Sequence, residues 1–296
     1  MDNEKDSVFC KELFLPVYLM IAQRFQLPTS NFRFRRLTFI CCWSLLLIFS
    51  FKADDYTLLK SIPFTDAIFT TDHLGNAYVI AENQLLQFDP QGKPKATYSE
   101  TNLGTLRSID ASNPMKILLF YPDFAQINIL NSKLSVQSTI RLRPLGITQP
   151  TLICNSGNEG YWIFDLQDFQ LKKIDLNLQV QFESGNISQN VGYNVLPNFL
   201  VEADNFVYLN NPSTGILVFD LYGTYYKTIP IRDLTSFQVI ADELVYVSGN
   251  KLISFHMKKL EQKEILLPSH DSFISARLEP KELFLLTTAS LNFYSF

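Results

Sequence analysis

Cysteine is scarce in this sequence, and its positions exclude a disulfide-stabilised scaffold. Of four cysteines, Cys10, Cys41 and Cys42 lie before or within an apolar segment near the N-terminus. A product processed after that segment would keep Cys154 alone. Such a product cannot form an internal disulfide.

Glycine, proline and basic clusters are also few. The chain has 11 glycines and 14 prolines and is 18% charged and 47% hydrophobic, which excludes collagen-like and disordered classes. Residues 1–52 hold seven basic and four acidic side chains, which leaves 18 basic and 25 acidic side chains in residues 53–296. Nucleic-acid binding requires a basic face. No nucleic acid is therefore expected as a partner.

Aromatic residues are abundant. The 25 Phe, 13 Tyr and 2 Trp make up 14% of the 296 residues. Aromatic side chains fit the pleated, half-buried surfaces of strands. This composition predicts an all-β protein, and all-β domains can reach roughly 200 to 250 residues as one unit.

The N-terminal segment has the pattern of an export signal. Arg33, Arg35 and Arg36 precede an uncharged apolar run over residues 37–51. A helix of that length would measure about 22 Å, which is short of the ~30 Å hydrocarbon core of a bilayer. We therefore expect residues 1–53 to form an N-terminal extension with a cleaved signal peptide. An uncleaved membrane anchor is the alternative, and Met20 is an alternative start.

A strand pattern recurs through residues 54–296. The separations between successive copies are 40, 43, 47, 38 and 38 residues. The strand that leads each copy is centred near Tyr78, Leu118, Tyr161, Tyr208, Tyr246 and Phe284. A period of that size matches four short strands and their turns, and radial packing of such units buries both faces of each. The pattern predicts a six-bladed β-propeller over residues 54–296.

The ends of the repeat predict how the ring closes. The last unit contains three strand-like runs, near 273–277, 282–286 and 291–296, and then the chain ends. The first unit is preceded by a spare run at residues 56–62. Pairing this run with residues 291–296 would complete the last blade and remove an open sheet edge. The fold class is therefore all-β, a six-bladed propeller closed by pairing of its N- and C-terminal strands.

Two turn motifs resemble a known group of propellers. The motifs are Asp72-x-x-Gly75-Asn76-x-Tyr78 and Phe88-Asp89-x-x-Gly92. They are similar to the blade turns of six-bladed propellers of the NHL and TolB-like type. In overall texture the chain resembles exported propellers of Bacteroidota envelopes. That resemblance implies a platform for a ligand or partner in the periplasm or outer envelope, although some such propellers are enzymes.

The aspartates that follow strands have two interpretations. Asp89, Asp175 and Asp220 could form a carboxylate ring, but each precedes a turn, so we expect them to bond backbone N–H groups there. Lactonase-like propellers hold calcium in the central channel with inner-strand Glu, Asn and Asp side chains. The corresponding candidates here are Asp66, Asp110, Asn155, Glu202 and Asp242. Whether they bind a metal is unknown from the sequence.

The other chemically active residue types form no recognisable catalytic pattern. His73, His256 and His270, the last beside Asp271, have no nucleophile at a characteristic spacing. Cys154 lies on an expected inner strand, where a buried structural thiol is expected. No catalytic residue and no cofactor is therefore predicted.

Five aromatic residues could either form a binding patch on one face or pack between blades. These residues are Tyr161, Trp162, Tyr222, Tyr225 and Tyr226.

These observations favour an exported, non-catalytic propeller that binds a protein or a glycan in the cell envelope. It would touch the membrane only through the N-terminal segment if that segment is uncleaved. The alternative is a metal-dependent hydrolase or lyase of the lactonase-like propeller type.

Overall fold

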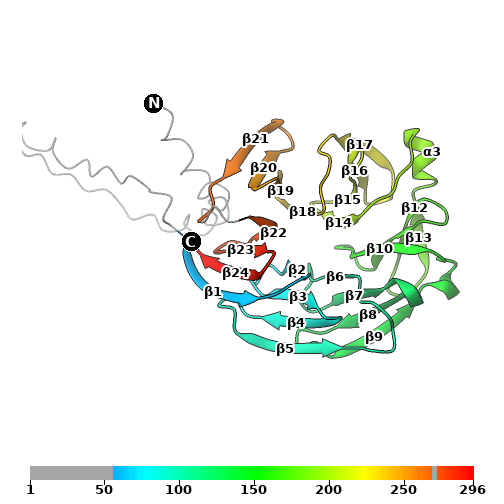
Figure 1. Cartoon of the computed structure of the whole chain (residues 1–296). Helices are drawn as coiled ribbons and strands as arrows, with labels where there is room; N and C mark the ends of the chain where they lie inside the picture. Colours follow the sequence, from blue (N-terminus) through cyan, green and yellow to red (C-terminus); the bar gives the residue numbers. More distant parts are fainter. Residues whose placement is uncertain (1–55, 269–271) are drawn as a thin grey trace, which may run out of the picture. The chain divides into compact units, whose positions relative to one another are not determined.

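The computed structural model describes residues 56–268 and 272–296. These residues form six four-stranded antiparallel sheets, which are arranged as the blades of a ring (Figure 1). The protein is an all-β, six-bladed β-propeller, as the sequence predicts. The expected export segment at residues 37–51 lies outside the described residues. Within the described part of the chain, no helix is long and apolar enough to cross a membrane.

The first three blades follow the chain order without crossovers. Blade 1 contains β2 (Ile68–Thr71), β3 (Ala77–Ala81), β4 (Gln84–Phe88) and β5 (Pro94–Ser99). Blade 2 contains β6 (Ser108–Asp110), β7 (Ile117–Tyr121), β8 (Gln126–Leu130) and β9 (Val136–Arg141). Blade 3 contains β10 (Pro150–Asn155), β11 (Tyr161–Asp165), β12 (Gln170–Ile174) and β13 (Val180–Glu183).

The remaining blades continue the order, and the last takes one strand from the start of the propeller. Blade 4 contains β14 (Phe199–Ala203), β15 (Phe206–Asn211), β16 (Gly215–Asp220) and β17 (Tyr225–Ile229). Blade 5 contains β18 (Phe237–Ile240), β19 (Glu243–Ser248), β20 (Lys251–His256) and β21 (Glu261–Ile265). Blade 6 contains β22 (Phe273–Leu278), β23 (Glu282–Thr287), β24 (Ser290–Ser295) and β1 (Thr57–Pro63). The described helices are short: η1 (Pro122–Phe124), η2 (Arg143–Leu145) and α3 (Ile187–Val191).

The ring closes through β1, as predicted. This strand pairs antiparallel with β24, from Thr57 opposite Ser295 to Pro63 opposite Ser290, with one register shift between Leu58 and Lys60. The pairing places β1 at the outer edge of blade 6, in the order β1-β24-β23-β22. An N-terminal strand therefore covers the edge that β24 would otherwise expose.

The core lies between neighbouring blades. The six expected leading strands are β3, β7, β11, β15, β19 and β23, the second strand of each blade. These strands are buried along most of their length because each blade packs a neighbour on both faces. Five clusters of buried apolar residues each join one blade to the next. Near-continuous apolar and aromatic runs, such as Ile117–Tyr121, supply these two-sided contacts.

The strand order defines two faces of the ring. In each antiparallel blade, the turns between strands one and two and between strands three and four lie at the same end. We call this end the pocket face; in blades 3 and 4 it includes the turns at residues 156–160 and 221–224. The turn between strands two and three lies on the opposite face, where blade 2 presents η1.

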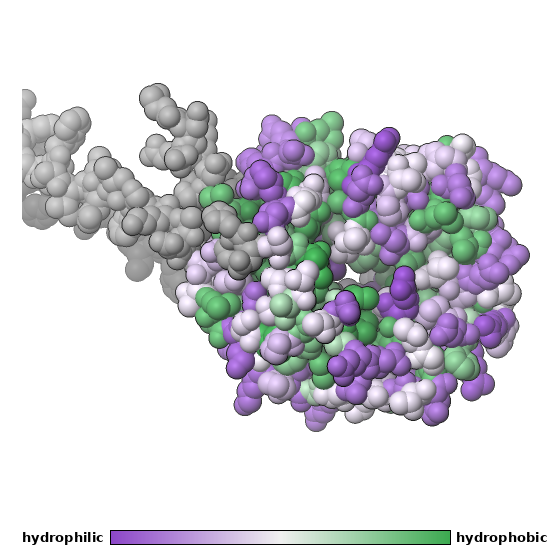
Figure 2. Space-filling model, in the orientation of Figure 1, coloured by the Kyte–Doolittle hydropathy of each residue, from purple (hydrophilic) through white to green (hydrophobic). Residues whose placement is uncertain are grey.

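The surface is mixed in character. Figure 2 shows hydrophilic residues along much of the outer edge of the propeller and hydrophobic residues in separate patches. Exposed apolar residues of the described chain are likewise distributed over several blades. Isolated exposed apolar side chains are normal for a soluble surface. Exposed apolar residues therefore do not by themselves mark a functional site.

Candidate functional site

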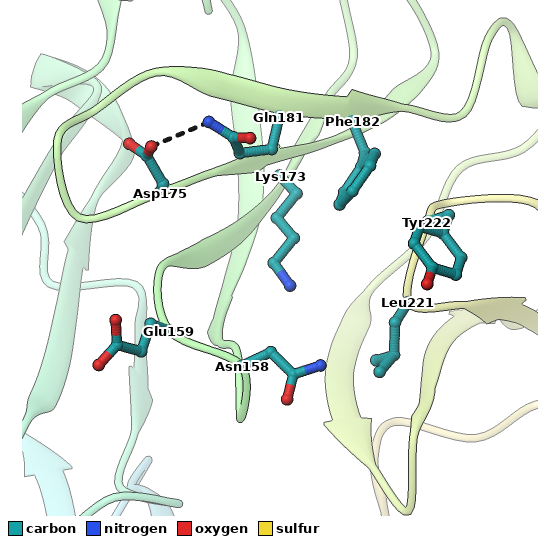
Figure 3. Close-up of a pocket in the computed structure, with 8 residues that line it drawn as sticks. All are labelled: Asn158, Glu159, Lys173, Asp175, Gln181, Phe182, Leu221 and Tyr222. Atoms are coloured by element: carbon teal, nitrogen blue, oxygen red, sulfur yellow. Dashed lines mark hydrogen bonds between the residues drawn. The ribbon is translucent and has the colours of Figure 1, made fainter.

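A pocket lies between blades 3 and 4 on the pocket face. Its volume is about 330 Å³, within the range of small-ligand sites. Figure 3 shows its lining side chains: Asn158, Glu159, Lys173, Asp175, Gln181, Phe182, Leu221 and Tyr222. Six of them belong to blade 3, and Leu221 and Tyr222 come from the β16–β17 turn of blade 4.

A row of side chains crosses blade 3 at the pocket, and two of them, Lys173 and Phe182, line it. Trp162 on β11 lies opposite Lys173 on β12, and Lys173 lies opposite Phe182 on β13. Residues directly opposite one another in an antiparallel sheet project from the same face. Trp162 belongs to the apolar cluster between blades 3 and 4, so the whole row faces blade 4.

Lys173 is buried but has no anionic partner. Its residue is 5% exposed, and its Nζ lies 5.5 Å from the centre of the Trp162 ring, which is a cation–π distance. Among the described residues, no carboxylate lies within salt-bridge distance of this ammonium, and it donates no hydrogen bond. Figure 3 shows the side chain directed into the pocket.

The neighbouring lysine has a different environment. Lys172 is equally buried, but it projects from the other face of β12 and its Nζ contacts Asp165 at 3.1 Å and Asp168 at 2.6 Å. These carboxylates raise the pKa of Lys172 against the opposing effect of burial, which is the largest single influence on it. The sequence therefore provides two acidic partners for one buried lysine and none for the next.

Trp162 is fixed by a carboxylate from blade 4. The Glu202 side chain accepts hydrogen bonds from Trp162 Nε1 at 2.6 Å, Ser156 Oγ at 2.7 Å and the Gly157 backbone N at 2.8 Å. Three donors of blade 3 thus use both oxygens of one inner-strand residue of blade 4. The bonds hold the indole, over which the Lys173 ammonium lies, against the next blade.

The wall of the pocket is aromatic and polar. Phe182 and Tyr222 meet edge to face, with ring centres 5.3 Å apart and an interplanar angle of 85°. The Tyr222 residue is 67% exposed, so most of its surface is free to touch a ligand. Asp175 closes the other side, where one of its oxygens accepts a hydrogen bond from Gln181 Nε2 at 2.9 Å.

The strand-ending aspartates stabilise turns, as the sequence predicts. Asp89 accepts hydrogen bonds from the backbone N–H groups two and four residues later, and Asp175 and Asp220 do the same. Asp72 and Asn131 have the same arrangement in other turns. Asp89, Asp175 and Asp220 are each bonded within their own turn, and among the described residues no contact joins them into a ring.

The calcium candidates do not converge as a set. Asp110 accepts a hydrogen bond from the backbone N of Asn155 at 2.6 Å, and Glu202 is bonded to blade 3. Asp242 lies in the β18–β19 turn and pairs with Lys258, and Asp66 lies in an exposed turn before β2. Within residues 56–268 and 272–296, no three His, Cys, Asp or Glu side chains are grouped so that they could hold a metal ion.

A buried carboxyl that the sequence analysis did not select lies at the start of the β22–β23 turn. Glu279 is 8% exposed and accepts a hydrogen bond from Thr71 Oγ1 of blade 1 at 2.5 Å. Burial raises its pKa to about 7, although the bond to Thr71 and the charge of Arg277 oppose the rise. Burial lowers the pKa of Arg277 itself, against the opposing influence of Glu279 and Asp110.

Of the described residues, His73, Cys154 and His256 belong to three different blades. His73 lies exposed in the β2–β3 turn, and His256 ends β20 with a buried Nδ1 that has no hydrogen-bond partner. His270 and Asp271 lie outside the described residues. Cys154 is 1% exposed, and burial raises the pKa of its thiol, as expected for a structural cysteine.

The aromatic residues proposed as one patch divide into three environments. Tyr161 packs toward blade 2, whereas Trp162 packs toward blade 4. Tyr222 lines the pocket, while Tyr225 and Tyr226 lie on β17, where they contact Phe219 and Phe206. Only Trp162 and Tyr222 of this set therefore belong to the blade 3–4 site.

Lys173 was not predicted as a site residue, although the sequence contains a signal for it. The run Gln170–Ile174 contains two adjacent lysines in a strand that has a partner strand on each side. Successive residues of a strand point to opposite faces, and both faces of a blade are buried. One lysine must therefore enter each interface, and its ammonium must either pair with a carboxylate or reach an opening between the blades.

No protein family model matches this chain, and no curated protein matches it in sequence. Solved structures do match it. The virginiamycin B lyase of Staphylococcus aureus is similar at 12% identity, with 81% of this chain and 99% of that chain covered and a TM-score of 0.57. BBS1N, solved in complex with ARL6DN, is similar at 13% identity, with 74% of each chain covered and a TM-score of 0.50.

A further neighbour is an extracellular domain from B. thetaiotaomicron, of a protein described as a one-component system. The identity is 11%, the alignment covers 77% of this chain but 32% of that chain, and the TM-score is 0.51. At these identities the likenesses show the fold alone. The propeller architecture is thus shared with a lyase, a protein-binding domain and an extracellular domain.

Proposed function

We propose that this chain is an exported, non-catalytic β-propeller that binds a protein or a glycan in the cell envelope. The observation that supports this most strongly is the blade 3–4 pocket, where the exposed Tyr222 and the unpaired Lys173 ammonium face the same space. Aromatic anchors beside a directed polar group are typical of recognition sites. The two structural neighbours described as a complex and as an extracellular domain support such a use of the fold.

The proposed location depends on the N-terminal sequence. Arg33, Arg35 and Arg36 followed by the apolar run 37–51 have the pattern of an export signal. In this proposal residues 1–53 form the extension and residues 54–296 form the propeller. A charged residue in the run, as in Leu46→Arg, should retain the protein in the cytoplasm; unchanged fractionation would argue against export.

A pull-down from the native envelope tests the platform role. Wild-type protein should capture a specific partner, and Tyr222→Ser should reduce the captured amount because it removes the exposed ring of the pocket. Phe124→Ser is the matched control, because Phe124 is an exposed aromatic residue (49%) on the opposite face. Equal capture by both variants would place the partner elsewhere, and no capture by wild type would reject the platform.

A metal-dependent lyase is the second candidate. The likeness to virginiamycin B lyase, which is covered over 99% of its length, is the observation that favours it. Metal analysis of the purified protein separates the two proposals. Stoichiometric calcium or zinc retained through dialysis would favour the lyase, and its loss would favour the binding platform.

A further inference from the structure

The blade 3–4 pocket contains a cation whose counter-ion is missing from the described chain. Lys173 is 5% exposed, yet among the described residues its ammonium makes no ion pair or hydrogen bond, and it lies 5.5 Å from the centre of the Trp162 ring. The ammonium itself opens into the pocket, where water can solvate it, and an anion in the pocket would replace that water with a charge-assisted hydrogen bond. The pocket therefore favours an anionic ligand.

Lys172 is a buried lysine with a structural role, and its ammonium is paired with carboxylates. It has the same exposure as Lys173 and lies one residue away on the same strand, but two carboxylates contact its ammonium. The blade 4 carboxylate that binds the Trp162 indole is used differently. Both oxygens of Glu202 accept bonds from Trp162, Ser156 and Gly157, so neither pairs with Lys173.

The remaining charges of the pocket limit the anion that fits. Two acidic residues, Glu159 and Asp175, also line it. Asp175 is occupied by turn N–H groups and by Gln181, and Figure 3 shows Glu159 directed away from the lysine. The lining carries one ammonium and two carboxylates, a formal charge of −1, so a doubly charged phosphate would be repelled more strongly than a singly charged carboxylate that contacts the ammonium. Amide groups of Asn158 and Gln181 in the lining can donate further hydrogen bonds to it.

The walls favour a carboxylate that is carried on a protein side chain. Phe182, Leu221 and Tyr222 form an apolar rim beside the ammonium, and the Tyr222 ring meets Phe182 edge to face. A rim of this kind packs the methylene stem of a glutamate or aspartate while the ammonium receives the charge. We propose that the pocket between blades 3 and 4 binds an acidic side chain, Glu or Asp, of a partner protein, with the Lys173 ammonium as its counter-ion.

This inference rests on the proposed platform role and names the group that the platform recognises. It can be tested in the full chain because Trp43 and Trp162 are the two tryptophans of the sequence. Protein labelled with 5-fluorotryptophan should give one fluorine NMR resonance for Trp162 and, if the segment 37–51 is retained, a second for Trp43, which Trp43→Phe assigns. The Trp162 resonance then reports on the contact with Lys173.

The probes are acetyl-Gly-Glu-Gly-amide, its Gln counterpart and methyl glucuronide. The Glu peptide is expected to shift the Trp162 resonance saturably, and the Gln peptide is not. Lys173→Met should weaken this binding by roughly tenfold or more, because the charge-assisted hydrogen bond is lost. Lys173→Arg, which keeps the charge, should retain it. The position of the resonance without a probe shows whether each variant is folded.

Lys227→Met is the matched control. Lys227 also lies over an aromatic ring, with its Nζ 5.6 Å from the centre of the Tyr226 ring, but it is outside the pocket. Its replacement should leave the binding of the Glu peptide unchanged. The inference is overturned if the Gln peptide causes the same shift, if Lys173→Met binds equally well, or if no probe moves the resonance at about 50 mM. Tighter binding of the glucuronide would assign the pocket to an acidic glycan and overturn the choice of a protein side chain.

The failure of this inference can be distinguished from failure of the platform role. Lys173→Met should capture less of the partner than wild type in the pull-down. Equal capture by the variant would reject the acidic anchor while leaving the platform supported. No capture by the wild type would reject the platform itself.

Discussion

Trp162 Nε1 of blade 3 donates a hydrogen bond to the Glu202 carboxylate of blade 4 at 2.6 Å. The indole is fully buried, so its N–H has no access to water if the acceptor is removed. An unsatisfied buried donor costs about 1 to 3 kcal/mol, and the Ser156 and Gly157 donors lose the same acceptor.

Glu202→Ala is therefore expected to lower the free energy of unfolding by about 3 kcal/mol. Chemical denaturation measures the change. Glu183→Ala, at an exposed position of β13, is the control and should change stability by less than about 0.5 kcal/mol. Equal effects of the two substitutions would show that the bond between the blades contributes nothing specific.

The closing strand gives a second prediction. Deletion of residues 1–63 removes β1 and exposes β24, whose Leu291 and Phe293 are fully buried. An exposed apolar edge favours edge-to-edge association, so this variant should aggregate or lose its cooperative thermal transition. Deletion of residues 1–50 should do neither. Light scattering and thermal unfolding distinguish the two, and a monomeric, cooperative Δ1–63 protein would contradict closure through β1.

The buried carboxyl of Glu279 predicts a pH dependence of stability. Its pKa is raised from 4.5 to about 7 in the folded state, so the folded protein holds this proton more tightly than the unfolded chain. The contribution to stability is fully present below pH 4.5 and is lost as the pH rises to about 7. The shift corresponds to a loss of roughly 3 kcal/mol over that range.

Glu279→Gln should remove this dependence, because the amide oxygen still accepts the bond from Thr71 Oγ1 but cannot ionise. Urea titrations at pH 5 and pH 8 measure the effect. Thr71→Val is the complementary variant: it removes a bond that lowers the pKa, so the loss of stability should move to higher pH. Parallel pH profiles for wild type and Glu279→Gln would disprove the assignment.

Gly160 gives a fourth prediction beside the pocket. Its φ is +91°, and a Cβ at this position would lie 2.1 Å from the Ile174 carbonyl oxygen. Gly146 has a similar φ of +79°, but a Cβ there meets nothing within 4 Å. Gly146→Ala should therefore cost about 1 kcal/mol from backbone strain alone, and Gly160→Ala about 3 kcal/mol more from the clash. Denaturant midpoints measure both, and similar costs would show that the clash relaxes freely.

The elements that could be predicted from the sequence share a physical cause. The six leading strands, the turn aspartates and the closing strand were predictable because they depend on local signals: strand periodicity, Asx-turn chemistry and an unpaired run at each end. The Phe-Asp-x-x-Gly turn, for example, specifies Asp89 and Gly92 within five residues.

The candidate site was less predictable because its parts are distant in sequence. Lys173 and Tyr222 share a pocket only because blades 3 and 4 are adjacent in the ring. Glu202 was selected as a channel ligand, but its role follows from the Trp162 indole of the neighbouring blade. The position of each strand can be inferred from its own residues, whereas contacts between blades depend on how the sheets pack.

Site-specific photocrosslinking in the native envelope tests the central claim most directly. Benzoylphenylalanine replaces Tyr222 in one variant and Phe124 in the other, so that the probe is on the pocket face or on the opposite face. A partner that binds at the blade 3–4 pocket predicts one discrete protein adduct from position 222 that Lys173→Met diminishes, and none from position 124. Adducts from position 124 alone, or of equal yield from both positions, would contradict a binding site between blades 3 and 4.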